Sequence, residues 1–92
     1  TESDIEDYSF SESQKEAIEL VRDLLKNSSF EKQGDLDEAL FDVKDDSELS
    51  TGKFFETIYK PILGKEEGPR LSRLILAIDQ EKTVKILEKT LK

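Results

Sequence analysis

The sequence predicts an all-α domain, a small bundle of four to five helices. Three observations support this fold class. Apolar residues recur at the helical spacing i, i+3, i+4 and i+7 in several separate segments. Residues that start and stop helices flank these segments, and no segment alternates polar and apolar residues as a strand would. The 92 residues suffice for one domain with a thin core, because only 35% are hydrophobic and 39% are charged.

The first predicted helix follows an acidic tail. Residues 1–10 are rich in carboxylates and poor in core-forming side chains, so we expect disorder there. The helical domain is then expected to span residues 11–92. Ser11 can cap a helix over about residues 12–27, and Gln14 completes a capping box with it.

The second predicted helix is short and covers about residues 36–44. Gly34 is expected to break the chain before it, and Asp35 is expected to cap it. Its apolar stripe holds only a few residues. A helix of this length is marginal in isolation, so we expect its stability to come from packing against neighbours.

The third predicted helix runs through the segment KFFETIYKPIL, and Ser50 or Thr51 can cap it. Pro61 is anomalous, because it lacks the N–H that the helix needs and its ring crowds the preceding turn. We therefore expect the helix to kink at Pro61 or to end near Tyr59. Gly64 is suited to the left-handed residue that closes a helix.

The remaining sequence predicts a turn at KEE and two further helices. Gly68 and Pro69 are expected to open the fourth helix, with proline at its preferred first position. Asp79 separates this helix from the fifth and can cap it. Lysines in the last turn of the fifth helix suit the negative end of the helix dipole.

Composition excludes several classes of function. The chain has no cysteine and no histidine, which excludes disulfides, a Ser-His-Asp triad and the usual zinc sites. No apolar run is long enough to span a bilayer, and the acidic start is unlike a signal peptide, so we expect a cytoplasmic protein. The absence of methionine leads us to expect a fragment of a longer chain.

Charge is distributed unevenly along the chain. Residues 1–50 hold 16 acidic and 5 basic side chains, a net charge of −11. Residues 51–92 hold 6 acidic and 9 basic side chains, a net charge of +3. Two interpretations stay open: one face contacts a polar partner, or the acidic surface only keeps the domain soluble.

The most specific segment is FFETIYKPILGKEEGPRLSRLILAI, residues 54–78. It pairs an aromatic-led FFxxIY helix with a Leu-Gly-Lys turn, and Gly-Pro-Arg-Leu then opens an apolar helix. This pattern resembles the anticodon-binding region of class I aminoacyl-tRNA synthetases, and the class I lysyl-tRNA synthetases above all. A weaker likeness covers about residues 10–92. Two residues depart from the family pattern. Pro61 lies where the family's helix usually continues without interruption, and Asp79 lies where the family favours glycine.

The resemblance implies a fold and a function. The fold would be an anticodon-binding domain of the α-helix cage type. Its partners would be the anticodon stem-loop of a lysine tRNA and an N-terminal catalytic domain of the same chain. That parent enzyme would form lysyl-tRNA from lysine, ATP (with Mg) and tRNA, whereas this fragment would be non-catalytic and need no cofactor. Two alternatives stay open: the anticodon-binding domain of a glutamyl-tRNA synthetase, and an acidic helical protein-interaction module.

The basic residues near the Gly-Pro-Arg turn are the candidate tRNA contacts. Arg70 and Arg73 are expected in the first turn and a half of the fourth helix, where free N–H groups attract phosphate and arginine adds a bidentate fork. The alternative for Arg70 is a salt bridge to Glu66, Glu67 or another acid. Three lysines near the same turn could follow a phosphate backbone or could simply be solvated: Lys53, Lys60 and Lys65.

The aromatic residues have two possible roles. Phe54, Phe55 and Tyr59 could stack on unpaired bases, but they lie on a helical apolar stripe, which favours core packing. Tyr59 is the best stacking candidate, because its hydroxyl needs a polar edge. The turn itself would be set by three structural residues: Gly64, Gly68 and Pro69. The acidic side chains are expected to face away from RNA: Asp35, Asp37, Glu38, Asp42, Asp45, Asp46 and Glu48.

Overall fold

The computed structural model describes residues 10–91, which form five helices and no strand. The all-α prediction is therefore confirmed. The helices are α2 (Glu12–Asn27), α3 (Gln33–Asp46), α4 (Thr51–Leu63), α5 (Leu71–Ile78) and α6 (Gln80–Leu91). The predicted disorder of the tail concerns residues 1–9, which lie outside the described part. Phe10, the last residue of that predicted tail, is half-buried against the core.

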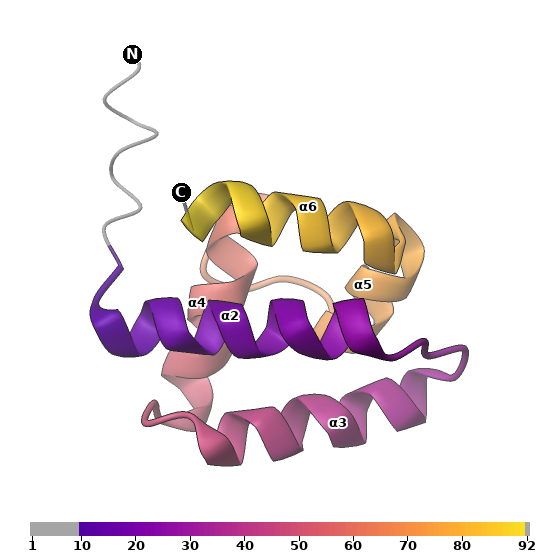
Figure 1. The fold of residues 1–92 in the computed structure, drawn as a ribbon, viewed down its shortest axis with the longest axis horizontal. Coiled ribbons are helices and arrows are strands. Elements are labelled where there is room, and N and C mark those ends of the chain that lie inside the picture. The colour runs from indigo at the N-terminus through magenta and orange to yellow at the C-terminus, as the bar shows by residue number, and fades with distance from the viewer. Residues whose placement is uncertain (1–9, 92) are drawn as a thin grey trace.

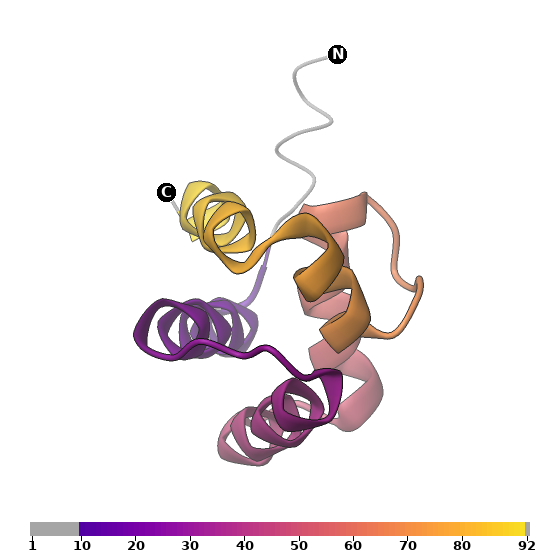
Figure 2. The same ribbon diagram turned by 90° about the vertical axis from the view of Figure 1, so that its right-hand side faces the viewer.

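The arrangement of the helices places α2 at the centre. It lies between α6 on one side and α3 on the other, and both views of the molecule agree on this order (Figures 1 and 2). Helices α4 and α5 lie on a further side of α2. In Figure 1, α4 crosses behind α2, α3 and α6. The chain that joins α4 to α5 runs over the outside of the molecule (Figure 2).

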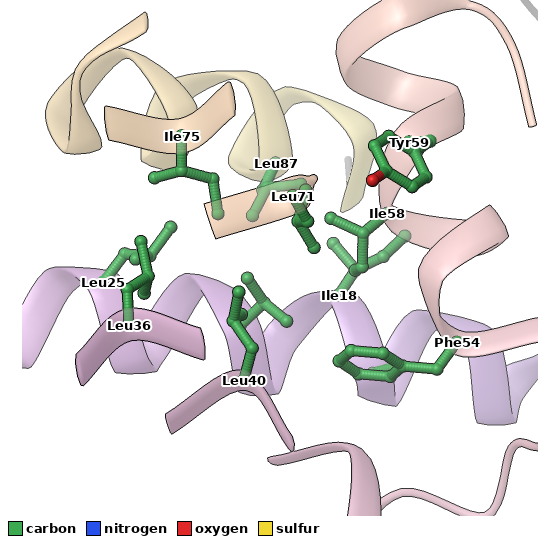
Figure 3. Packing of buried hydrophobic residues seen from close by; sticks show 12 residues of the cluster. Ile18, Leu25, Leu36, Leu40, Phe54, Ile58, Tyr59, Leu71, Ile75 and Leu87 are labelled. Carbon is green, nitrogen blue, oxygen red and sulfur yellow. The ribbon is translucent and has the colours of Figure 1, made fainter. Parts of the chain in front are cut away.

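The core is one cluster to which every helix contributes (Figure 3). Each fully buried Leu, Ile or Phe side chain in it stabilises the fold by about 1.5–3 kcal/mol. The sequence predicted these residues from their helical spacing. Its buried hydrophobic members are Ala17, Ile18, Val21, Leu25, Leu36, Leu40, Phe54, Ile58, Tyr59, Leu71, Ile75 and Leu87.

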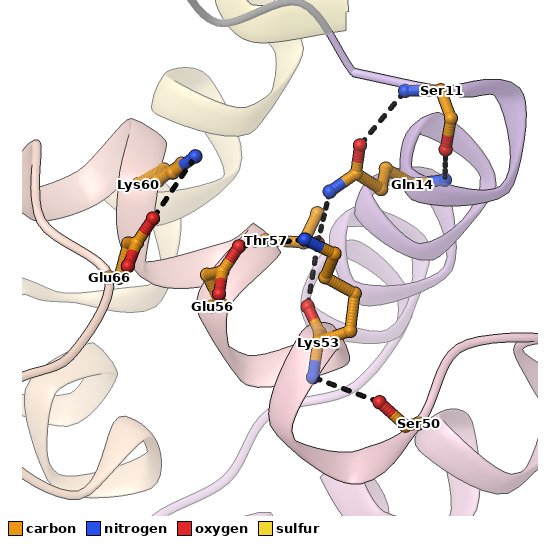
Figure 4. Close-up of polar contacts among 8 residues, drawn as sticks. All are labelled: Ser11, Gln14, Ser50, Lys53, Glu56, Thr57, Lys60 and Glu66. Carbon is orange, nitrogen blue, oxygen red and sulfur yellow. Dashed lines mark hydrogen bonds and ion pairs between the residues drawn. The ribbon is translucent and has the colours of Figure 1, made fainter.

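The start of α2 confirms the predicted capping box (Figure 4). The Ser11 N–H donates to Gln14 Oε1 at 2.9 Å, and the Gln14 N–H donates to Ser11 Oγ at 3.2 Å. Gln14 has a second role, because its Nε2 donates to Thr57 Oγ1 of α4 at 3.0 Å. Thr57 is buried, and its hydroxyl donates to the Lys53 carbonyl at 2.7 Å. One side chain thus caps α2 and ties it to α4.

Helix α3 is longer than the sequence predicts. It begins at Gln33, so Gly34 lies inside its first turn and does not break the chain, and Asp35 is not the capping residue. Lys32 holds the N-cap position without a side-chain cap. Open space surrounds the position that a Cβ at Gly34 would take.

Helix α4 is capped by Ser50, whose hydroxyl accepts from the Lys53 N–H at 3.3 Å. It continues through Pro61 to Leu63, so of the two alternatives expected for Pro61, an end of the helix near Tyr59 is excluded. Pro61 lies in the last turn, where the loss of one backbone hydrogen bond affects little of the helix. Gly64 closes the helix with φ 72° and ψ 14°, the left-handed conformation that the sequence predicts.

Helix α5 begins two residues later than expected. Pro69 is not its first residue; Arg70 holds the N-cap position with φ −51° and ψ 132°, and Leu71 is the first helical residue. A single residue, Asp79, joins α5 to α6, and its φ is 105°. Its carbonyl accepts from the N–H of Thr83 at 3.0 Å, which begins the hydrogen-bond ladder of α6.

Candidate nucleic-acid interface

The connection between α4 and α5, residues 64–70, is here called the hinge. Tyr59 of α4 holds its far end, because the Tyr59 hydroxyl donates to the Pro69 carbonyl. The Tyr59 side chain is only 8% exposed. Burial raises the pKa of the Tyr59 hydroxyl, nearby Arg70 opposes this, and Asp37 adds to it. Tyr59 therefore stays protonated at neutral pH and is available as a donor.

Two further contacts fix the hinge against the end of α4. A Cβ added at Gly68 would lie 2.5 Å from Leu63 Cδ1, so the backbone approaches α4 more closely than other residues allow without a shift of that side chain. Lys60 Nζ of α4 lies 3.6 Å from the Glu66 carboxylate (Figure 4). The hinge is therefore held at its middle through Glu66 and toward its far end through Gly68 and Pro69.

Arg70 is placed beside α3. Its Nη1 lies 3.2 Å from Asp37 Oδ2, and the two side chains are 59% and 26% exposed. Asp37 was expected to face away from RNA, and it lies beside Arg70, a candidate RNA contact. Of the alternatives for Arg70, the ion pair forms, but with an acid 33 positions away rather than with Glu66 or Glu67. The guanidinium stays largely exposed and has donors to spare.

The other basic candidates are spread over a longer path. Arg73 and Lys65 are exposed, and neither makes an ion pair with another described residue. Lys53 pairs with Glu56 at 3.1 Å in the first turn of α4. The hinge follows the last turn of that helix, so Lys53 lies about 15 Å away along the axis at 1.5 Å per residue. The structure brings Lys60, Tyr59 and Arg70 together and leaves Lys53 apart.

The aromatic candidates belong mainly to the core. Phe54 is buried and Phe55 is half-buried, and their rings meet edge to face with centroids 5.2 Å apart. The Tyr59 ring is buried. Tyr59 therefore acts on the candidate interface by holding Pro69, the residue before Arg70. Sequence reasoning missed Phe41, which is 43% exposed and packs its ring edge to face on Phe55 at 5.5 Å. The signal was available, because Phe41 lies on the flank of the apolar stripe of α3.

A hollow between the C-terminal end of α2 and helix α6 bears on the protein-interaction alternative. An adaptor would show an exposed apolar groove, but this hollow is lined mostly by polar and charged side chains. Gln80 lies in it and binds three backbone groups. Its Oε1 accepts from the Phe30 N–H at 2.7 Å, and its Nε2 donates to the Ser28 carbonyl at 2.8 Å and to the Leu25 carbonyl at 3.1 Å. The hollow therefore does not favour an adaptor.

The comparisons with known proteins decide between these interpretations. Residues 1–91 match the family described as anticodon binding domain. The chain belongs to this family. Within the part that the structure describes, no helix combines the length and apolarity that crossing a membrane requires. No solved structure gave a significant match.

Curated relatives of this anticodon binding domain are lysine–tRNA ligases. The protein from Pyrococcus horikoshii is 31% identical over 77 residues, which is 84% of this chain and 15% of the relative. The one from Borrelia garinii subsp. bavariensis is 32% identical over 79 residues, or 85% and 15% of the two chains. The one from Methanosphaera stadtmanae is 29% identical over 72 residues, or 78% and 14%. The chain thus spans about one seventh of the length of these relatives. Their names favour the lysyl over the glutamyl assignment.

Proposed function

We propose that this domain holds the anticodon stem-loop of a lysine tRNA as part of a class I lysine–tRNA ligase. The observation that carries the proposal is the family match over residues 1–91, together with the lysine–tRNA ligases among the relatives. The domain itself performs no chemistry. A catalytic part of the same cytoplasmic enzyme would join lysine to tRNA with ATP and Mg.

The hinge supports this role through the placement of Arg70. The Tyr59–Pro69 hydrogen bond fixes the residue before Arg70, and the Asp37 carboxylate fixes its side chain. A guanidinium held in this way loses less conformational freedom when it binds a phosphate or a base edge. Arg73 and Lys65 add exposed positive charge that no described carboxylate neutralises.

The test is fluorescence anisotropy at low salt with a labelled lysine-tRNA stem-loop and a glutamate-tRNA stem-loop. We expect tighter binding of the lysine stem-loop. Arg70→Ala should weaken binding about tenfold, the loss of about 1–2 kcal/mol that one arginine contact supplies.

The matched control is Arg22→Ala, since Arg22 also pairs with a neighbouring acid, Asp23, but lies on α2. Circular dichroism establishes that each variant is folded. Unchanged affinity in folded Arg70→Ala would contradict the assignment of the hinge. Preferential binding of the glutamate stem-loop would instead favour a glutamyl-tRNA synthetase.

A further inference from the structure

The outer face of α6 carries a row of lysines. Lys82, Lys85 and Lys89 are separated by three and four positions, so they lie on one face of the helix. All three are exposed, whereas Thr83 and Leu87 of the same helix are buried. At 1.5 Å per residue, the row is about 10 Å long. We call it the α6 lysine row.

These lysines differ from the basic residues around α4 and the hinge in having no acidic partner. Lys53, Lys60 and Arg70 each lie within ion-pair distance of a carboxylate. None of the three lysines of the row does so among residues 10–91. The only ion pair of α6 in that range joins Glu88 to Lys26. The row is therefore a group of three exposed lysines without an ion-pair partner among residues 10–91.

Helix α3 shows the opposite charge. It holds six acidic residues and a single lysine, which pairs with Asp45. Helix α2 lies between α3 and α6, so the acidic and basic helices lie on opposite sides of the domain (Figures 1 and 2). A polyanion that approaches this domain is therefore attracted to the lysines of α6 more strongly than to the exposed carboxylates of α3.

We propose that the α6 lysine row is a second RNA-binding surface, which holds the phosphate backbone of the stem whose loop meets the hinge. This inference rests on the proposed function. Helix α6 contacts both α4 and α5, the helices that flank the hinge. The longest dimension of the domain is 38 Å, which limits how far apart the hinge and the row can lie. The lysines contribute affinity without reading sequence, because a phosphate backbone carries no base information.

The test compares two double variants with the same loss of charge. Lys85→Gln with Lys89→Gln removes two charges from the row. Lys15→Gln with Lys32→Gln removes two exposed charges from α2 and from the start of α3, where neither lysine is ion-paired with a described residue. Affinity for the lysine stem-loop is measured by anisotropy with the full 92-residue chain over a range of salt concentrations.

We expect the row variant to reduce the slope of log K against log[salt] by about 1.5, since each lost phosphate contact removes about 0.7–0.9. Affinity at low salt should fall about tenfold, because the two phosphate contacts of these lysines are lost. The control double variant should change neither quantity. A single-stranded oligonucleotide with the loop sequence should bind both variants alike.

Three outcomes would overturn the proposal. An unchanged slope of log K against log[salt] in the row variant, or an equal change in both double variants, would show that the row does not bind the phosphate backbone. An equal loss with the single-stranded oligonucleotide assigns the lysines to the loop and not to the stem. If the unaltered domain binds neither stem-loop, the proposed function fails and this inference falls with it. If it binds and Arg70→Ala weakens it while the row variant does not, only this inference fails.

Discussion

Replacement of Gln80 by alanine tests the contact between α2 and α6 most directly. The Gln80 side chain makes three hydrogen bonds to backbone groups of residues 25–30. Each such bond contributes a net 0.5–1.5 kcal/mol, or about 3 kcal/mol for the three. The Ser28 carbonyl is exposed and can bind water instead, whereas the contact with Phe30 N–H is half-buried. We therefore expect Gln80→Ala to lower the free energy of unfolding by about 2 kcal/mol.

The assay is urea and thermal unfolding of the full chain, followed by circular dichroism at 222 nm. A loss of about 2 kcal/mol corresponds to a fall in Tm of roughly 10 °C for a domain of this size. Gln33→Ala is the matched control, because Gln33 is exposed at the start of α3 and should change the stability by less than about 0.5 kcal/mol. A Gln80→Ala variant as stable as this control would refute the reasoning.

The remaining predictions concern three local features. Asp79→Gly should raise the free energy of unfolding by about 1 kcal/mol, because glycine adopts φ 105° without strain. Asp79→Ala is the control and should not raise it, and chemical unfolding measures the stability of both variants. Ser72→Ala should raise the Tm by several degrees, because the buried Ser72 Oγ makes no hydrogen bond within the described residues; a lower Tm would contradict this. Tyr59→Phe should cost about 1 kcal/mol at pH 7. The raised pKa of Tyr59 contributes stability that is complete below pH 10 and is lost as pH rises through the folded-state pKa. The difference between wild type and Tyr59→Phe should therefore shrink above pH 10, and a constant difference in unfolding titrations would exclude the ionisation.

Local signals explain where the sequence was a good guide to the fold. Ser11 and Gln14 mark the start of α2 because a capping box depends on residues only three positions apart. Gly64 marks the end of α4 because a left-handed residue is needed there. The core was readable from helical spacing, since burial on one face of a helix produces that spacing.

The errors came from weak local signals at helix starts. Gly34 and Asp35 looked like a break and a cap, but α3 is stabilised by burial of Leu36 and Leu40 and begins earlier. Pro69 fits a first helical position equally well, yet its carbonyl is bound by Tyr59 and Arg70 holds the N-cap position. The starts of α3 and α5 depend on packing between distant residues, which a local sequence pattern does not contain.

The candidate site was less predictable than the fold, because its key contacts join distant residues. Arg70 pairs with Asp37 across 33 positions, and Gln80 reaches Phe30 across 50. Neither contact has a local sequence signature. For Arg70, the acidic residues are also too numerous for the sequence to single out Asp37. The sequence did predict a turn between the third and fourth helices, with Arg70 and Arg73 after it. Which carboxylates lie beside them depends on how α3 and α5 pack.

The double role of Gln14 has a consequence for hydrogen exchange. The first turn of a helix usually frays, and its amides exchange through local openings that leave the rest of the fold intact. Here the side chain that caps α2 also binds Thr57 in the middle of α4. The start of α2 cannot open without releasing that half-buried contact. The amides at the start of α2 and those around Thr57 should therefore exchange as one cooperative unit, so the N-terminal end of α2 and the middle of α4 open together.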